Sequence, residues 1–266
     1  MTTVDTRSGS GRTRSRALVL GALIPVGALL LWQIVTALRL IDPLFMPAPA
    51  AVVTAFGEWI TDGGLAEDMS ISLQRAALGF VLGGGLGVIV GVLTGFSAAA
   101  SRLLDPSLQV VRLTPTLAIA PLLVLWFGFG ELSKVVLIAS LAFFPLYMSV
   151  HQGIRQVGTA FVEVGRVLEF SRWDHLRLIL GPAALPYLFT GLRLSLGVSW
   201  IGLIVAEITG SQSGVGHLII AGQTQNRTDL VFVGIAIFAL MGWLIDRAVT
   251  VLQRRVLRWN DSHSGF

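Results

Sequence analysis

The sequence contains no cysteine and only one lysine, Lys134, among its 266 residues. Without cysteine the chain can form no disulfide, no thiolate metal site and no thiol nucleophile. The four histidines, at positions 151, 175, 217 and 263, do not have the spacing of metal ligands. A phosphate-binding loop needs a lysine directly after its second glycine, but Lys134 follows Ser133 in GFGELSKV. We therefore expect no metal, no cofactor and no ATP on this chain.

Charged residues are also scarce, at 13% of the chain against about 25% in soluble domains. Hydrophobic residues make up 54%, and the mean hydropathy is +0.78. So few charges cannot cover the surface of a soluble protein, which predicts an integral membrane protein in contact with the lipid bilayer. The composition argues against a cytosolic enzyme, a disordered scaffold and a nucleic-acid-binding protein, although the net charge is +4.

Six apolar runs are candidates for crossing a hydrocarbon core of about 30 Å at 1.5 Å per residue. They cover residues 17–37, 76–98, 108–129, 135–150, 184–208 and 230–252. We predict an all-α membrane protein with six transmembrane helices in one domain, residues 17–252, between polar tails at 1–16 and 253–266. The first run lacks a small-residue cleavage site, which favours an uncleaved span over a signal peptide. Residues 50–60, AAVVTAFGEWI, predict a short amphipathic helix near the membrane surface.

Basic residues are distributed unequally between the two sides that these spans define. Thirteen lie on the side of the N-terminus: Arg7, Arg12, Arg14, Arg16, Arg102, Arg155, Arg166, Arg172, Arg177, Arg247, Arg254, Arg255 and Arg258. Four lie on the opposite side: Arg39, Arg75, Lys134 and Arg227. Because basic residues are enriched in cytoplasmic segments, both termini and the loop at 151–182 are predicted to be cytoplasmic.

Glycines and prolines punctuate the predicted spans. Five glycines of the second span recur every four residues: Gly79, Gly83, Gly87, Gly91 and Gly95. This spacing forms one stripe on a helix and favours close helix–helix packing over a glycine-lined gate. Pro115, Pro121 and Pro145 lie in the third and fourth spans, where they predict either packing kinks or broken helices around a polar cavity.

The loop at 159–186 mixes apolar and charged residues at helical spacing. Such a segment could present an apolar face to a partner or lie on the membrane surface. It resembles the signature of ATP-binding-cassette importer permeases, E-A-A-x-x-x-G followed later by I-x-L-P. Residues that stand in this pattern are Glu163, Val164, Gly165, Ile179 and Pro182. Two departures are Glu169 at the glycine position and Gly181 at the leucine before the proline.

Further segments resemble the sulfonate, nitrate and taurine branch of these permeases. They are Phe45 to Pro49, residues 104–135 and 205–219, and the closing RRVLRWN. The resemblance covers about Pro43 to Asn260 and implies the type I importer permease architecture in a bacterial inner (plasma) membrane. It also implies three kinds of partner: a second permease copy, two ATPase subunits that bind ATP, and an extracytoplasmic substrate-binding protein.

The resemblance further implies that a coupling loop at 152–182 docks on the ATPase. The residues expected to contribute are Glu163, Gly165, Arg166, Phe170, Trp173 and Pro182. Two other function classes were weighed. An ion-coupled secondary carrier is disfavoured because the spans show neither paired acids nor internal repeats. A membrane-embedded enzyme is disfavoured because the histidines are scattered.

The resemblance favours a small organic anion as the cargo, with an aliphatic sulfonate as the first choice, ahead of nitrate, taurine or a vitamin precursor. Two arginines lie in the first halves of spans and could either snorkel to the membrane surface or face an anion. The residues expected along the substrate path are these two and four nearby hydroxyl groups: Arg112, Arg193, Thr114, Thr116, Ser195 and Ser199. Weak contacts from such groups suit a conduit, since tight binding would slow release.

Overall fold

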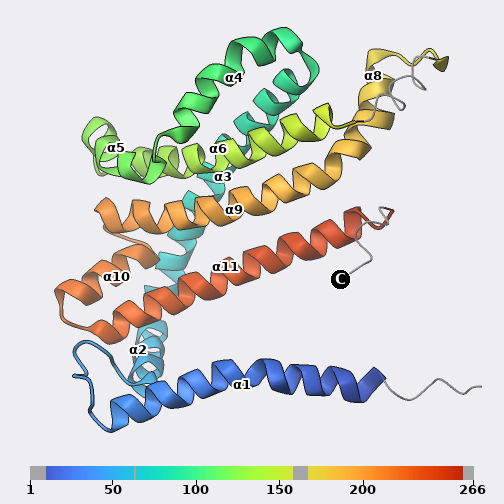
Figure 1. The fold of residues 1–266 in the computed structure, drawn as a ribbon. Helices are drawn as coiled ribbons and strands as arrows, with labels where there is room; N and C mark the ends of the chain where they lie inside the picture. Colours follow the sequence, from blue (N-terminus) through green and yellow to red (C-terminus); the bar gives the residue numbers. More distant parts are fainter. Residues whose placement is uncertain (1–9, 63, 158–166, 260–266) are drawn as a thin grey trace, which may run out of the picture.

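The structure is a computed structural model that describes residues 10–62, 64–157 and 167–259. Over these residues it consists of helices joined by short connections (Figure 1). The elements are α1 (Ser10–Ala37), α2 (Pro49–Thr61), α3 (Gly64–Phe96), α4 (Ala98–Leu113), the 3-10 turn η1 (Thr116–Ile119), α5 (Ala120–Phe127), α6 (Glu131–Arg155), α8 (Arg172–Asp174), the π-helical turn η2 (His175–Leu180), α9 (Gly181–Gly210), α10 (Val215–Thr224) and α11 (Thr228–Val256). The all-α fold class is confirmed.

Four helical segments are long and apolar enough to cross a membrane: α3, α6, α11 and the continuous segment Arg177–Gly210. They contain the second, fourth, fifth and sixth predicted spans. The first predicted span lies in α1, whose apolar part among the residues searched is the shorter stretch Leu23–Ala37. The count of six spans therefore remains a prediction.

The third predicted span, 108–129, is interrupted, and a broken helix is one of the two outcomes that its prolines predicted. The chain there forms α4 and then η1 with α5, and the two parts meet at an angle of 74°. Thr114 is extended, with φ −71° and ψ 128°, and ends α4. The reason is local: a residue before proline is disfavoured in the α-helical region, and Pro115 has no N–H to continue the helix.

The other two prolines of interest do not interrupt their helices. Pro121 lies in the first turn of α5, where its missing N–H has no helical acceptor to lose. Pro145 lies inside α6, which runs without interruption from Glu131 to Arg155. The stretch 209–229, between the fifth and sixth predicted spans, contains the ten-residue helix α10, which is too short to span.

The glycine stripe of α3 packs directly on α6. A Cβ atom on Gly83 would overlap the backbone carbonyl of Ala139, and one on Gly87 would lie 2.5 Å from the carbonyl oxygen of Phe143. Gly79 and Gly91 also lie close to backbone oxygens of α6, and Gly95 lies against the side chain of Ile154. The predicted packing role is confirmed, because only residues without a side chain let the two backbones approach this closely.

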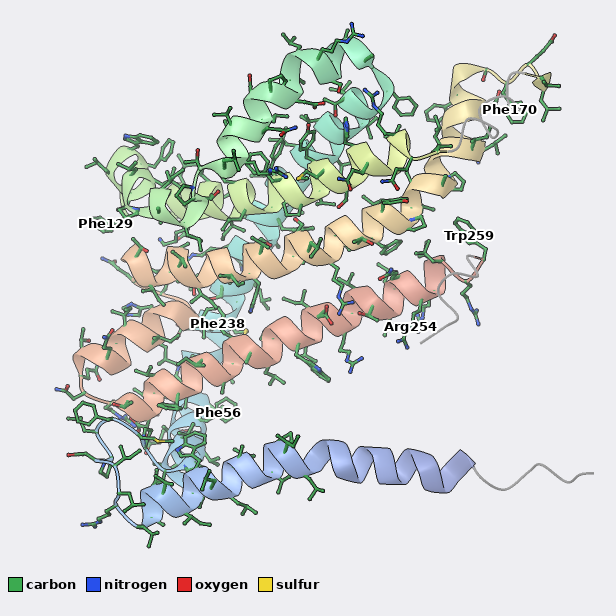
Figure 2. The ribbon with its side chains drawn as sticks, viewed as in Figure 1. Phe56, Phe129, Phe170, Phe238, Arg254 and Trp259 are labelled. Atoms are coloured by element: carbon green, nitrogen blue, oxygen red, sulfur yellow. The ribbon has the colours of Figure 1, made fainter. Side chains whose placement is uncertain are left out.

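The helix ends sort into two sides. α1 begins and α11 ends on the side where α8 lies, whereas α5 and α10 lie on the opposite side (Figure 1). Side chains mark the same division: Phe170, Arg254 and Trp259 lie at one end of the bundle and Phe129 at the other (Figure 2). This arrangement matches the predicted alternation, in which the helical part of α1, the end of α11 and the 151–182 region share a side. That this side is cytoplasmic stays a prediction.

Candidate functional site: a translocation path and a coupling surface

The predicted path residues fall into two separate groups in the structure. Arg112, Thr114 and Thr116 lie at the end of α4 and in the following break, whereas Arg193, Ser195 and Ser199 lie on α9. Arg112 lines a cavity between α4 and α6, and Arg193 lines a smaller one between α9 and α11. The two arginines are therefore not brought into one cavity of a single chain.

The α9 group is occupied by contacts within the chain. Arg193 pairs with Asp246 of α11, with Nε 2.5 Å from Oδ1 and Nη2 3.0 Å from Oδ2. Ser195 is fully buried and donates to the carbonyl oxygen of Ala142 at 2.6 Å, so it joins α9 to α6. Ser199 donates to the carbonyl oxygen of Leu196 in its own helix at 3.1 Å. These side chains have partners before any substrate arrives.

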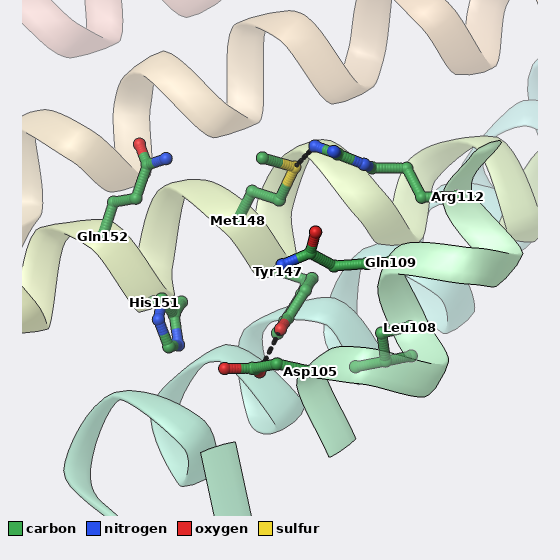
Figure 3. A pocket seen from close by; sticks show the side chains of 8 residues that line it. All are labelled: Asp105, Leu108, Gln109, Arg112, Tyr147, Met148, His151 and Gln152. Atoms are coloured by element: carbon green, nitrogen blue, oxygen red, sulfur yellow. Dashed lines mark hydrogen bonds between the residues drawn. The ribbon is translucent and has the colours of Figure 1, made fainter. Parts of the chain in front are cut away.

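Of the α4 group, Arg112 lines a polar pocket of about 270 Å³ (Figure 3). One wall comes from α4, with Asp105, Leu108, Gln109 and Arg112, and the other from α6, with Tyr147, Met148, His151 and Gln152. The α4 residues are spaced i, i+3, i+4 and i+7, which places them on one face of that helix. The Tyr147 hydroxyl donates to Asp105 Oδ1 at 2.5 Å, and this bond ties the two walls together.

Sequence reasoning found Arg112 but missed the other polar residues of this pocket. The available signal was the helical spacing of polar residues within α4 and near the end of α6. That signal was not sufficient, because the two walls lie on separate helices and the sequence does not show that these residues face one another.

A second polar cluster lies at the opposite end of the bundle, near α10. Arg75 of α3 donates to Glu207 of α9 at 2.9 Å and to Glu131 of α6 at 2.6 Å. Arg75 also donates to the backbone oxygen of Ser213, in the turn before α10, at 2.7 Å. Glu207 is only 1% exposed, so its carboxylate is enclosed by this cluster.

The turn before α10 is held by the same cluster. Ser72 donates to Glu207 Oε1 at 2.7 Å and accepts from the backbone N–H of Val215 at 3.0 Å. Glu207 Oε2 accepts from the N–H of Gly216 at 2.8 Å, and Asp68 accepts from the N–H of Gly214 at 2.7 Å. Three backbone donors at the start of α10 thus find side-chain acceptors, which replaces an ordinary helix cap.

The predicted coupling residues are only partly described. Glu163, Gly165 and Arg166 lie outside the described residues. Three large apolar side chains that follow in the sequence are exposed: Val167 (81%), Leu168 (58%) and Trp173 (66%). This is an unusual concentration of exposed apolar side chains at one end of the molecule.

Two local features shape the described part of the coupling segment. Glu169 adopts φ +51°, a left-handed conformation that favours glycine. Ser171 then begins α8: its hydroxyl accepts from the N–H of Asp174 at 3.2 Å, and the Asp174 carboxylate accepts from the N–H of Ser171 at 3.3 Å. This reciprocal arrangement is a capping box. Pro182 lies in the first turn of α9, where proline is favoured.

Comparison with known proteins identifies the class of this bundle. A family described as "binding-protein-dependent transport system inner membrane component" matches residues 83–258. The chain belongs to this family. The matched region runs from the glycine stripe of α3 to the end of α11 and includes the polar pocket, the coupling segment and Glu207. The chain is therefore an inner-membrane transport subunit, and α1 and α2 precede the shared region.

Individual relatives place this permease more closely. It is 46% identical over 92% of its length to SsuC of Bacillus subtilis, named as an aliphatic sulfonates transport permease, and covers 89% of that protein. It is 38% identical to SsuC of Escherichia coli, over 90% of this chain and 91% of that protein. It is 35% identical to the taurine transport permease TauC of Escherichia coli, over 87% of this chain and 86% of that protein. The predicted resemblance to the sulfonate, nitrate and taurine branch is confirmed.

The fold is also shared with a solved importer. A chain of the methionine ABC transporter MetNI, in an inward-facing conformation, superposes with a TM-score of 0.53 at 19% identity. The match covers 73% of this permease and 96% of that chain. At this identity the likeness establishes the type I permease fold alone.

Proposed function

We propose that this permease forms the translocation path for an aliphatic sulfonate and is energised by a separate ATPase. The observation that carries the cargo assignment is the 46% identity to the Bacillus subtilis sulfonate permease along nearly the whole chain. Taurine is the second candidate, because the taurine permease TauC is 35% identical. Taurine is itself an aminosulfonate, so both candidates share the headgroup that the path must accommodate.

Growth on defined sulfur sources tests the cargo. A strain lacking this permease and any redundant system should fail to grow with ethanesulfonate as sole sulfur source and should recover when the gene is restored. Growth on sulfate is the control, since it bypasses sulfonate uptake. Undiminished growth of the deletion strain on ethanesulfonate and on taurine would exclude both sulfonate cargoes and leave nitrate or a vitamin precursor.

The proposed assembly contains two permease copies, two ATPase subunits and an extracytoplasmic binding protein. The coupling surface consists of Glu163, Gly165, Arg166, Phe170, Trp173 and Pro182. Support comes from the exposed apolar side chains on either side of Glu169, since an ATPase groove would cover an apolar surface that water would otherwise contact. Pro182 contributes indirectly, by beginning α9 directly after the segment.

The Glu163→Arg substitution tests the coupling role. We expect the variant to insert into the membrane normally but to lose copurification with the ATPase, or to leave ATP hydrolysis uncoupled from uptake. Glu67→Arg is the matched control, because it makes the same charge change in the first turn of α3, outside the coupling segment. Normal sulfonate uptake by Glu163→Arg would exclude Glu163 from the coupling surface without affecting the cargo assignment.

A further inference from the structure

The pocket between α4 and α6 differs in chemistry from the other large cavities. Grooves of about 380 and 460 Å³ elsewhere in the bundle are lined mainly by apolar residues. The α4–α6 pocket instead has polar or titratable side chains at six of its eight lining positions. Within a membrane protein, such side chains are costly against lipid and face an aqueous cavity or the protein interior. The polar lining therefore suits a solute with a polar group better than the apolar grooves do.

The depth of the pocket follows from its position on α6. Tyr147 to Gln152 occupy the last two turns before the helix ends at Arg155. At 1.5 Å per residue, the pocket lies about 5–12 Å from that end, on the side of α8 and the coupling segment. In the orientation that the arginine distribution predicts, a solute in this pocket would be near the end of its path into the cell.

The walls of the pocket are held in place by bonds that leave its donors available. Asp105 accepts from Tyr147 and from Ser101, and the imidazole Nδ1 of His151 lies 2.8 Å from the Thr94 hydroxyl of α3. In contrast, the only hydrogen-bond partner that the described residues give Arg112 is the sulfur of Met148, a weak acceptor, at 2.8 Å. The side-chain amides of Gln109 and Gln152 have no partner among the described residues.

From these contacts, and on the basis of the proposed function, we infer that the α4–α6 pocket binds the sulfonate group of the cargo before release. Arg112, Gln109 and Gln152 would donate to the sulfonate oxygens, and Leu108 and Met148 would contact the aliphatic chain. The match is chemical: a sulfonate carries no proton and only accepts hydrogen bonds, whereas a guanidinium has five N–H donors and each amide has two. The exposed position of Arg112 keeps the binding weak, as a conduit requires.

Asp105 makes the two ends of this pocket different in charge. It lies seven residues before Arg112 on the same helix, which is two turns or about 10 Å away. A sulfonate at Arg112 therefore places the far end of a short solute toward a carboxylate. That end can be neutral or cationic, as in ethanesulfonate or taurine, whereas a second negative group there would be repelled.

The test uses the complete importer, reconstituted in vesicles with its ATPase and binding protein. Uptake of ethanesulfonate by Arg112→Gln should fall about tenfold or more, because a hydrogen bond to a charged group is lost. Arg112→Lys should retain part of the uptake, since it keeps the charge but not the planar donors. Arg102→Gln, an exposed arginine on the same helix outside the pocket, should transport at the wild-type rate.

Selectivity separates a binding role from a structural one. Asp105→Asn should lower the ratio of taurine to ethanesulfonate uptake, because it removes the carboxylate that faces the ammonium group of taurine. Gln152→Leu should reduce uptake of both solutes while the complex still copurifies with its ATPase. If Arg112→Gln and Gln152→Leu take up ethanesulfonate at the wild-type rate, the pocket assignment is wrong although the permease still carries sulfonates. If the wild-type importer takes up neither solute, the proposed cargo itself is wrong.

Discussion

Arg75 of α3 and Glu207 of α9 form an ion pair that is almost entirely buried: Nη1 lies 2.9 Å from Oε1, and the two side chains are 4% and 0% exposed. The two residues are 132 positions apart in the chain, so the pair joins helices that are distant in the sequence. It also anchors the turn before α10, because the same guanidinium donates to Ser213 and the same carboxylate accepts from Gly216. The end of the bundle at α10 is thus held together by a buried ion pair and the hydrogen bonds around it.

Removing this arginine should destabilise the permease strongly. Arg75→Ala leaves the buried Glu207 carboxylate without its countercharge, and breaking one side of a buried pair costs about 3–5 kcal/mol. Glu131→Gln should cost about 1 kcal/mol or less, because that carboxylate is 60% exposed and water can replace the lost contact. Thermal unfolding of the purified protein in detergent measures both variants. Equal losses of stability in the two variants would show that the contribution of each ion pair does not depend on how deeply its carboxylate is buried.

Two glycines of α3, one in the stripe and one two residues later outside it, give a pair of matched substitutions. Gly83→Ala places a methyl group against the backbone of Ala139, which cannot rotate away, and should destabilise the protein by about 1–3 kcal/mol. Gly85→Ala meets nothing within 4 Å and should be neutral or stabilise α3 by up to about 1 kcal/mol. The same unfolding assay compares them. A neutral Gly83→Ala would mean that α3 and α6 are not packed at this point.

Glu169 occupies a backbone conformation that suits glycine. Glu169→Gly should therefore be tolerated, with unchanged uptake and a slightly higher Tm, since a left-handed conformation costs about 1–2 kcal/mol for a residue with a Cβ. Glu169→Val should lower both uptake and Tm, because a β-branched residue is strained further there. A severe loss of uptake in Glu169→Gly would instead show that the glutamate side chain contacts the ATPase.

The absence of cysteine makes the orientation simple to test. A single cysteine at Gln225, exposed after α10, should react with a membrane-impermeant maleimide in intact cells. One at Arg254, exposed near the end of α11, should react only after the membrane is opened. The unsubstituted permease provides a background without thiols. The reverse labelling pattern would contradict the orientation derived from the arginine distribution.

The sequence alone determined the features that depend on composition and on neighbouring residues. Scarcity of charge predicted a membrane protein, and apolar runs located the helices α3, α6, α9 and α11 to within about a turn at most ends, although α3 begins earlier than predicted. The four-residue spacing of glycines in α3 predicted close packing, because that periodicity places all of them on one face whatever the partner is. The motif around Glu163 predicted the transporter family for a similar reason, since it is continuous in sequence.

Only the tertiary structure decided which distant residues meet. Arg75 was assigned only to one side of the membrane, because nothing in the sequence reveals that its side chain meets Glu207. The pocket that contains Asp105, Gln109 and Gln152 was missed because its walls lie on two helices. The bend at Thr114–Pro115 contributes to the orientation in which α4 faces α6. The hydrophobic pattern of a helix shows which of its residues avoid water. A salt bridge or a pocket depends instead on how several helices are placed relative to one another, and that placement is determined by their packing.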